Sequence, residues 1–276
     1  EMPPAAFAEA STLSLDAVPP PPEWGAPPAA TPEPAMEPAA LADTSPAPAL
    51  DIEPVQFELQ RVGWAQQQAA QSAYRTVGIY SGPLGFGYNT ELLARKKLAV
   101  PTTWADLLNP AYKGEIQVAN PASSGTAYTM VATLVQLMGE DKAFDYLRSL
   151  HKNVSTYTRS GTAPIKAVAR GETMVSISFV HDGPGEAMQG FPVATITPAE
   201  GTGAEIGSMS IIKGARNLTQ AQKFYEWALT PQAQQFGAAA KQFQLPSNKS
   251  AKVDPRVPDF KKIKFIDYDY AKYGAS

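Results

Sequence analysis

The chain has 276 residues, with 23 basic and 26 acidic side chains, a formal net charge of −3 at pH 7 and no cysteine. The absence of cysteine excludes a disulfide framework, thiol chemistry and cysteine-ligated zinc or iron–sulfur centres. No run of 18 or more apolar residues occurs, so no transmembrane helix is expected. The N-terminus lacks the basic start and apolar core of a signal peptide, so a cytoplasmic, mature or truncated protein is expected.

The charge is unevenly distributed along the chain. Residues 1–60 contain ten acidic residues and no lysine or arginine, so the rest, with 16 acidic and 23 basic residues, carries +7. A basic globular part suits an anionic ligand, although solvated surface lysines would explain the same count. The basic residues are scattered and form no stripe, so nucleic-acid binding is not expected.

Residues 1–55 form a segment of distinct composition. The stretch PPPPEWGAPPAATPEPAMEPAA is almost entirely proline, alanine and acid. Proline interrupts helices and removes the backbone donor that a β-ladder needs. Few large apolar residues are present to offset the loss of chain entropy on folding. The composition therefore predicts a disordered or extended segment.

From residue 56 onward the pattern is that of a globular α/β protein. Helices are predicted where apolar residues recur at helical spacing, and strands where apolar and polar residues alternate. In chain order, the expected elements are a helix (62–74), a strand entering a glycine turn (76–82), a helix begun by an asparagine cap (89–97), a short helix (102–110), a strand (114–120), a helix ending at 139, a second helix (141–152), a strand, turn and helix (154–172), strands at 173–180, 191–197 and 205–212, and helices at 219–229 and 231–243. This alternation predicts an α/β architecture with mainly parallel sheets.

Two local details of these helices are specific enough to compare with a structure. The helix at 141–152 is predicted to turn Phe144, Leu147 and Leu150 toward the core, because they share one helical face. The helix that follows residue 218 is predicted to begin with Thr219 as its N-cap, because a threonine hydroxyl can accept a bond from a free N–H of the first turn.

Two polar clusters lie directly before predicted helices. The first contains Ser123, Ser124, Gly125 and Thr126, and the second contains Arg159, Ser160, Gly161 and Thr162. Free N–H groups and the helix dipole at such positions favour an anion such as phosphate. In open α/β sheets, ligands bind beyond the carboxyl ends of the strands. Simple helix capping and a surface arginine would explain the same residues, so both interpretations stay open.

A third cluster follows the strand predicted at 173–180. His181 stands beside Asp182 in the stretch FVHDGPGE, and Glu205 comes later, in AEGTGAE. Carboxylates without a metal commonly accept hydrogen bonds from ligand hydroxyls. A turn with internally satisfied side chains would explain the His-Asp pair equally well. The other histidine, His151, lies at a polar helix end and is expected to be structural or solvated.

The sequence offers no frame for metal or enzymatic chemistry. Its two histidines are 30 residues apart and no HExxH spacing occurs, so no metal site is predicted. No GxSxG elbow, Walker A loop or dinucleotide-binding fingerprint is present. A protein that is not an enzyme and needs no cofactor is expected.

Seven segments carry a resemblance to a known family. They are GIYSGPLGFGYNTELL, TTWADLLNPAYKGEI, ANPASSGTAY, YTRSGTAPIKAVARGE, EIGSMSIIKGARN, FYEWALTPQAQ and LPSNK. In this order, from about residue 58 to the end, they resemble the periplasmic solute-binding proteins of ABC importers, in the ferric-ion-binding-like branch. The resemblance implies a type II periplasmic-binding-protein fold, in which two α/β lobes joined by crossing strands close on a ligand.

The resemblance also implies a domain organisation. IYSGPLGFGYN would run from lobe one into lobe two, and EIGSMSII would run back. Lobe one would comprise 56–91 and 205–276 with the hinge strands, and lobe two would comprise 92–204. Family members begin lobe one with alternating strands and helices, and residues 1–55 show no such pattern. An incomplete or atypical first lobe is therefore expected.

The resemblance further suggests a class of ligand. Ferric-ion members carry a pair of tyrosines near the position of FVHD, where this chain has none, so iron is disfavoured. The His-Asp pair with the glutamate of EIG is similar to the branch that binds hexose phosphates or aminoalkylphosphonates. By this resemblance His181, Asp182 and Glu205 would bond sugar hydroxyls or an amine, and the two serine-rich clusters would lie near the phosphate. The predicted ligand-binding residues are Ser81, Ser123, Ser124, Gly125, Thr126, Arg159, Ser160, Gly161, Thr162, His181, Asp182 and Glu205.

The sequence therefore predicts an extracytoplasmic solute-binding protein that delivers a small phosphorylated organic solute, a sugar phosphate or phosphonate, to the membrane permease of an ABC importer. A mature periplasmic form and a monomer are expected. Three alternatives stay open: a structural or interaction subunit derived from such a protein, ferric-ion binding through Tyr88 and acids, and a hydrolase built on His181 and Asp182.

Overall fold

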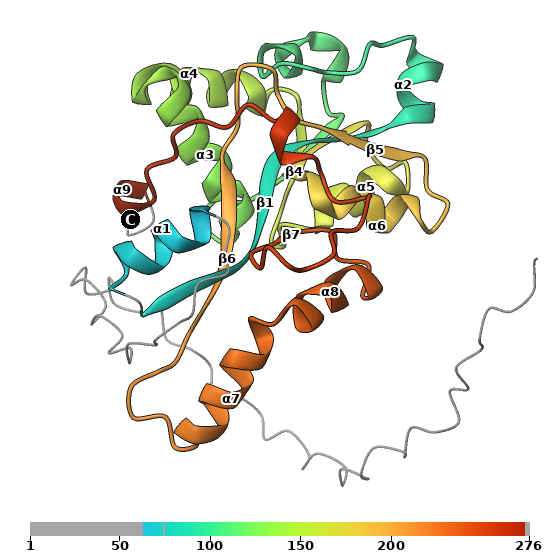
Figure 1. Cartoon of the computed structure of the whole chain (residues 1–276). Helices are drawn as coiled ribbons and strands as arrows, with labels where there is room; N and C mark the ends of the chain where they lie inside the picture. The colour runs from blue at the N-terminus through green and yellow to red at the C-terminus, as the bar shows by residue number, and fades with distance from the viewer. Residues whose placement is uncertain (1–62, 74, 274–276) are drawn as a thin grey trace, which may run out of the picture. The chain divides into compact units, whose positions relative to one another are not determined.

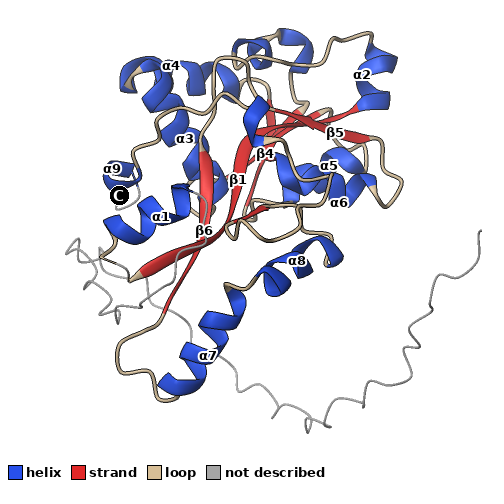
Figure 2. Ribbon diagram, viewed as in Figure 1, coloured by secondary structure: helices blue, strands red, loops and turns tan. Residues whose placement is uncertain are grey.

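The computed structural model describes residues 63–73 and 75–273 (Figures 1 and 2). The expectation for 1–55 falls outside these residues. The strands are β1 (Thr76–Asn89), β2 (Ile116–Ala119), β3 (Val154–Thr158), β4 (Val175–Phe179), β5 (Val193–Ile196), β6 (Ala204–Ser210) and β7 (Leu245–Pro246). The α-helices are α1 (Gly63–Gln71), α2 (Thr90–Lys96), α3 (Gly125–Met138), α4 (Glu140–His151), α5 (Ala163–Ala169), α6 (Gly183–Ala187), α7 (Leu218–Ala228), α8 (Pro231–Ala239) and α9 (Tyr270–Tyr273).

The long strand β1 belongs to two ladders. Its first half pairs with β6 and β7, and its second half, from Leu84, pairs with β4 and β5. The expected glycine turn at 82 is wrong, because β1 continues without a turn to Asn89. Glycines in β1 instead allow neighbouring elements to pack closely against the strand. A Cβ on Gly87, for example, would collide with the side chain of Ile165 in α5.

The sheet is mixed rather than mainly parallel, so that expectation is also wrong. The strand order is β3-β2-β4-β1-β5, and β2 is parallel to both β3 and β4. β1 is antiparallel to all four of its partners. The α/β class itself is confirmed, and β2, β3 and β4 end at one common edge of the sheet.

Helices cover both faces of the sheet (Figure 2). On one face, Ile177 and Phe179 of β4 pack into a core with Met130 and Leu134 of α3. On the other face, β4 presents the buried serines 176 and 178, and α5 lies against this surface of small residues. The alternation in β4 that was predicted from the sequence therefore separates an apolar core from a face that a short helix can approach closely.

A second, smaller core lies at the other end of β1. It is formed by buried residues of α1, β1, α7 and the segment after β6, including Val77, Ile211 and Tyr225. Thus β1 contributes to both cores. Within the described ranges, none of the helices combines the length and apolarity that crossing a membrane requires.

Several predicted helix ends are confirmed and others are wrong. Asn89 caps α2, because its side chain accepts a bond from the N–H of Leu92. α7 begins at Leu218 after Asn217, so Thr219 is not its cap.

In α4, Leu150 is buried as predicted, but Phe144 is 42% exposed. The smaller Ala143 and the hydrogen-bonded Tyr146 occupy the inner face instead. The short helix expected at 102–110 is two 3₁₀ turns, Ala105–Leu108 and Pro110–Tyr112.

Candidate functional site

The three polar clusters predicted from the sequence all follow the carboxyl ends of parallel strands. β2 leads into 123–126, β3 leads into 159–162, and β4 leads into the 3₁₀ turn Val180–Asp182. Because β3, β2 and β4 are adjacent and parallel, these clusters lie along one edge of the sheet, with roughly 5 Å between neighbouring strands. The arrangement matches the usual ligand position in open α/β sheets.

At one end of this edge, His181, Asp182 and Glu205 form a group that we call the carboxylate cluster. The Nε2 atom of His181 lies 3.5 Å from Oδ1 of Asp182 and 3.9 Å from Oε1 of Glu205. Glu205 reaches this point from β6, where it pairs with Gly82 of β1. The His181 ring is 3% exposed and stacks on Phe179, with ring centroids 5.4 Å apart. The structure thus brings together the three residues for which hydroxyl binding was predicted.

Burial sets the charge state of this cluster. It lowers the pKa of His181 to about 4, so the imidazole is neutral at pH 7. Burial also raises the pKa of Asp182 to about 6, with Lys166 opposing the shift and Glu186 adding to it. Burial and then the charge of Asp182 raise the pKa of Glu205 to about 7. The cluster therefore presents two carboxyl groups, poorly hydrated, that can accept hydrogen bonds from a ligand.

Tyr80 adjoins the carboxylate cluster and was not predicted. Its pKa is raised by burial and by the charges of Glu205 and Asp182. Its ring lies against Gly207, its cross-strand partner, where a Cβ would collide with it. The sequence did contain a signal: residues 80 and 82 of one extended strand point to the same face.

The other two clusters form a pair that we call the hydroxyl loops, residues 123–126 and 159–162. A Cβ on Gly161 would collide with the hydroxyl of Thr126 and would lie 2.9 Å from Oγ of Ser124. The hydroxyl of Ser123 donates to the carbonyl of Arg159 over 3.2 Å. Only a glycine at 161 lets the two loops meet this closely.

The hydroxyl loops leave several polar groups available to a ligand. Ser124 occupies the N-cap position of the 14-residue helix α3, but its side chain makes no capping hydrogen bond. The first N–H groups of α3, from Gly125 and Thr126, have no partner within the helix. The hydroxyls of Ser160 and Thr162 lie 3.2 Å apart, and Arg159 is exposed beside them. Together these groups offer donors and positive charge to an anion.

Ser81 contacts the backbone of Glu205, but its side chain lies on the other face of the β1–β6 ribbon from the carboxylate cluster. It pairs with Ile206, so its side chain points to the opposite face of the β1–β6 ribbon from Glu205. Its hydroxyl donates to the backbone carbonyl of Glu205 over 2.8 Å. On that face it lines a cavity of about 470 Å³ between α1, β6 and the segment after residue 260.

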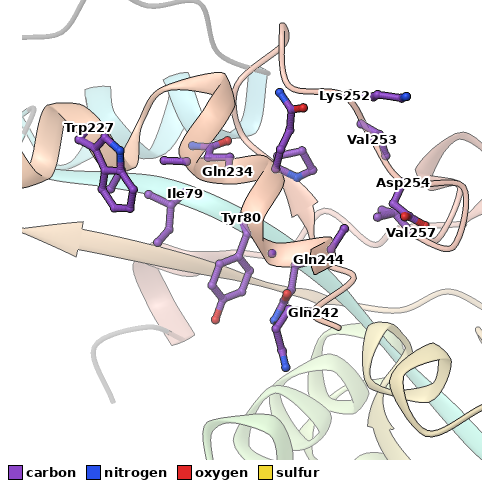
Figure 3. Close-up of a pocket in the computed structure, with 16 residues that line it drawn as sticks. Ile79, Tyr80, Trp227, Gln234, Gln242, Gln244, Lys252, Val253, Asp254 and Val257 are labelled. Atoms are coloured by element: carbon purple, nitrogen blue, oxygen red, sulfur yellow. The ribbon is translucent and has the colours of Figure 1, made fainter. Parts of the chain in front are cut away.

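A smaller cavity of about 220 Å³ shares only Tyr80 with the surroundings of the carboxylate cluster (Figure 3). Figure 3 shows Ile79 and Tyr80 of β1 near Trp227, with Gln242 and Gln244 beyond Tyr80. Its remaining lining comes mainly from α8 and the segment that follows it, so it lies away from the hydroxyl loops.

Other polar and aromatic candidate residues contact neighbouring parts of the fold and lie outside the two clusters. His151 stacks on Tyr157, and its Nδ1 lies 3.0 Å from the tyrosine hydroxyl. Glu200, the first glutamate of the stretch AEGTGAE, accepts a bond from the backbone N–H of Trp104 over 2.9 Å. Tyr88 packs against the larger core, six residues from Gly82 along β1 and so roughly 20 Å away. Within the described ranges, no group of three or more His, Cys, Asp or Glu side chains is arranged to hold a metal ion.

Replacing Glu205 with glutamine is expected to stabilise the protein at pH 8 by roughly 1–3 kcal/mol. The folded pKa of about 7 lies above the ordinary value of 4.5. The folded state therefore binds a proton that the unfolded state lacks, and stability falls as pH rises between these values. Glutamine removes this loss, so the difference should disappear near pH 4. Urea unfolding at the two pH values measures it.

The exposed Glu226 of α7 provides the control. Glu226→Gln should change the free energy of unfolding by less than about 0.5 kcal/mol at either pH. A Glu205→Gln variant that is less stable than the parent at pH 8 would contradict the expected cost of the buried carboxylate.

The chain is similar in sequence and fold to known bacterial binding proteins. The family model described as bacterial extracellular solute-binding protein matches residues 57–273. A protein of unassigned function from Haemophilus influenzae is 45% identical over 213 residues, which cover 76% of this chain and 62% of that protein. The chain therefore spans about three fifths of that relative's length.

Two solved structures are similar in both sequence and fold. The periplasmic binding protein AfuA from Actinobacillus pleuropneumoniae, with fructose 6-phosphate bound, is 49% identical with a TM-score of 0.70. The match covers 73% of this chain and 64% of AfuA. The periplasmic binding protein P5PA is 40% identical with a TM-score of 0.75, over 82% of this chain and 72% of that one.

Proposed function

Because the chain belongs to the bacterial extracellular solute-binding protein family, we propose that it binds a small phosphorylated organic solute and delivers it to an ABC importer. The observation that carries this proposal is the placement of the carboxylate cluster and the hydroxyl loops along one edge of the sheet. Carboxylates accept bonds from hydroxyls, whereas helix N-termini and hydroxyl donors suit phosphate. A solute with both kinds of group would fit this order.

The hydroxyl end of the solute would lie at the carboxylate cluster. Asp182 and Glu205 supply acceptors, and neutral His181 can donate or accept through Nε2. The phosphate end would lie at the hydroxyl loops, which follow β2 and β3 and so lie one and two strand spacings, roughly 5 and 10 Å, along the edge from β4. Fructose 6-phosphate, the molecule bound in AfuA, carries hydroxyls and a phosphate at its two ends and is the first candidate class.

The proposed lobes follow from the two ladders of β1. Lobe two would be 92–204, and lobe one would comprise 56–91 and 205–276. The antiparallel ribbon of β1 and β6 would be the hinge between them. The solute would lie between the lobes, beside this ribbon. The partner would be the membrane permease of the importer, the protein would act in the periplasm as a monomer, and no turnover of the solute is proposed.

The proposal is tested by calorimetry and native mass spectrometry on the chain. Fructose 6-phosphate is expected to bind with a micromolar or lower Kd, and fructose and inorganic phosphate to bind at least ten times more weakly. Each compound lacks one set of charge-assisted or hydroxyl contacts, worth about 1.5–3 kcal/mol per strong bond. Aminoethylphosphonate, titrated in parallel, distinguishes a phosphonate from a sugar phosphate.

Two outcomes would overturn the proposal. One is a folded chain that binds neither a sugar phosphate nor a phosphonate and carries no phosphorus-containing molecule from the cell, which would favour an interaction subunit. The other is a visible charge-transfer band on titration with ferric citrate, which would favour iron binding through tyrosine.

A further inference from the structure

Gly82 of β1 lies directly against the His181 ring. A Cβ built on Gly82 would collide with Nδ1 and Cε1 of His181. The backbone at Gly82 lies within an extended strand and is not in the left-handed region, so its conformation alone does not require glycine. What requires glycine is the closeness of the ring.

An aromatic side chain covers one face of the His181 ring. The Phe179 ring stacks on His181 at an interplanar angle of 10°. Among the described residues, Nδ1 of His181 is buried without a hydrogen-bond partner. With the Nδ1–Cε1 edge turned to Gly82, it is Nε2 that faces the carboxylates of Asp182 and Glu205. Contact with the strand, rather than a hydrogen bond at Nδ1, therefore sets the orientation of the ring.

We propose that Gly82 is a positioning residue of the solute site: its bare backbone lies at the Nδ1–Cε1 edge of the His181 ring, while Phe179 stacks on the ring face, so that Nε2 is directed to the carboxylates. The effect of Gly82 on solute binding rests on the proposed function, in which the carboxylate cluster binds the solute. Gly82 also pairs with Glu205 across the ribbon. The register of β1 with β6 thus places both Gly82, against which the His181 ring packs, and the backbone of Glu205.

The chain has only two histidines, so their ring signals can be followed individually by NMR titration. Gly82→Ala is expected to displace the His181 ring into water and raise its pKa by at least one unit, toward the ordinary value near 6.5. The ring signals of His151, which is exposed and pairs with Tyr157, are the internal control and should not change with the substitution. An unchanged His181 titration in a folded Gly82→Ala variant would overturn the inference.

A double-mutant cycle covers the case in which Gly82→Ala folds poorly. If the alanine acts by collision with the ring, His181→Ala removes the obstacle. The loss of Tm caused by Gly82→Ala should then fall at least by half in the His181→Ala background. An equal loss in both backgrounds would mean that the alanine disturbs β1 itself, and the inference would be wrong.

Gly87→Ala in the same strand is the matched control. Its Cβ would collide with Ile165 and would lie 2.7 Å from Oγ of Ser176. It should lower Tm without altering the His181 titration. With fructose 6-phosphate as the probe, Gly82→Ala should weaken binding at least tenfold and Gly87→Ala less than threefold. If the parent chain does not bind fructose 6-phosphate, this sugar phosphate is not the solute, and the titration and the Tm cycle still test whether Gly82 sets the orientation of the His181 ring.

Discussion

Replacing Asp182 with alanine is expected to weaken the binding of fructose 6-phosphate at least tenfold at pH 7.5, a loss of about 1.4 kcal/mol. The Asp182 side chain is 14% exposed, and the residue is the N-cap of α6, next to His181. A solute hydroxyl bound there exchanges water for a carboxylate in a poorly hydrated site. Removing the carboxylate would leave that hydroxyl without an acceptor, which costs about 1–3 kcal/mol.

The effect of Asp182 should depend on pH in a defined direction. Its pKa is about 6, and the ionised form is the stronger acceptor. The Kd of the variant divided by the Kd of the parent should therefore be larger at pH 7.5 than at pH 5. Taking this ratio cancels the titration of the phosphate, because the solute is the same in both measurements.

Asp145→Ala is the control for this prediction. Asp145 is 76% exposed and pairs with Arg148 on the surface of α4. Its removal should leave the Kd within twofold, since exposed ion pairs contribute little. A Kd that is the same for the parent and for Asp182→Ala would remove Asp182 from the site.

Replacing Trp104 with alanine is expected to lower the free energy of unfolding by about 3–5 kcal/mol. Trp104 is 2% exposed and packs edge-on against Phe86 and Tyr146, with centroids at 5.0 and 6.4 Å. Its indole N–H donates to the carbonyl of Gly201 over 3.2 Å. Truncation would create a cavity and leave that carbonyl without its donor.

Trp104→Phe separates these two contributions. Phenylalanine keeps much of the packing but loses the indole N–H, so a smaller loss of about 1–2 kcal/mol is expected. Urea unfolding followed by circular dichroism measures both variants. A loss below 1 kcal/mol for Trp104→Ala would contradict the expected contribution of the indole, through its packing on Phe86 and Tyr146 and its bond to Gly201, to the stability of the fold.

Local patterns in the sequence predicted many elements of the fold. The alternation of Val175, Ile177 and Phe179 gave a correct strand, and Asn89 gave a correct helix cap. Strand direction was predicted wrongly, because the pairing of β1 with β4, β5, β6 and β7 depends on contacts far apart in the chain. The glycine at 82 was misinterpreted for a similar reason: a turn and a close approach to a distant ring require the same residue.

The proximity of three candidate residues was predicted, whereas their contact with a solute stays a prediction. His181 and Asp182 were recognisable as a pair after a strand, and the resemblance added Glu205, which the structure places beside them. The family itself is confirmed by the match over residues 57–273. The direction of the Ser81 side chain could not be predicted from its motif, because it follows from the register of Ser81 with Ile206; a contact between Ser81 and the solute stays a prediction.

One residue of β1 separates its two ladders. Pro83 is the last residue paired with β6, opposite Ala204, and Leu84 is the first paired with β4, opposite Phe179. Proline has no N–H and leaves one rung of the ladder unmade. A change of angle at this point would break no bond donated by the residue itself. Because the proline ring fixes φ, a bend at Pro83 during the proposed solute capture would have to come mainly from its ψ angle.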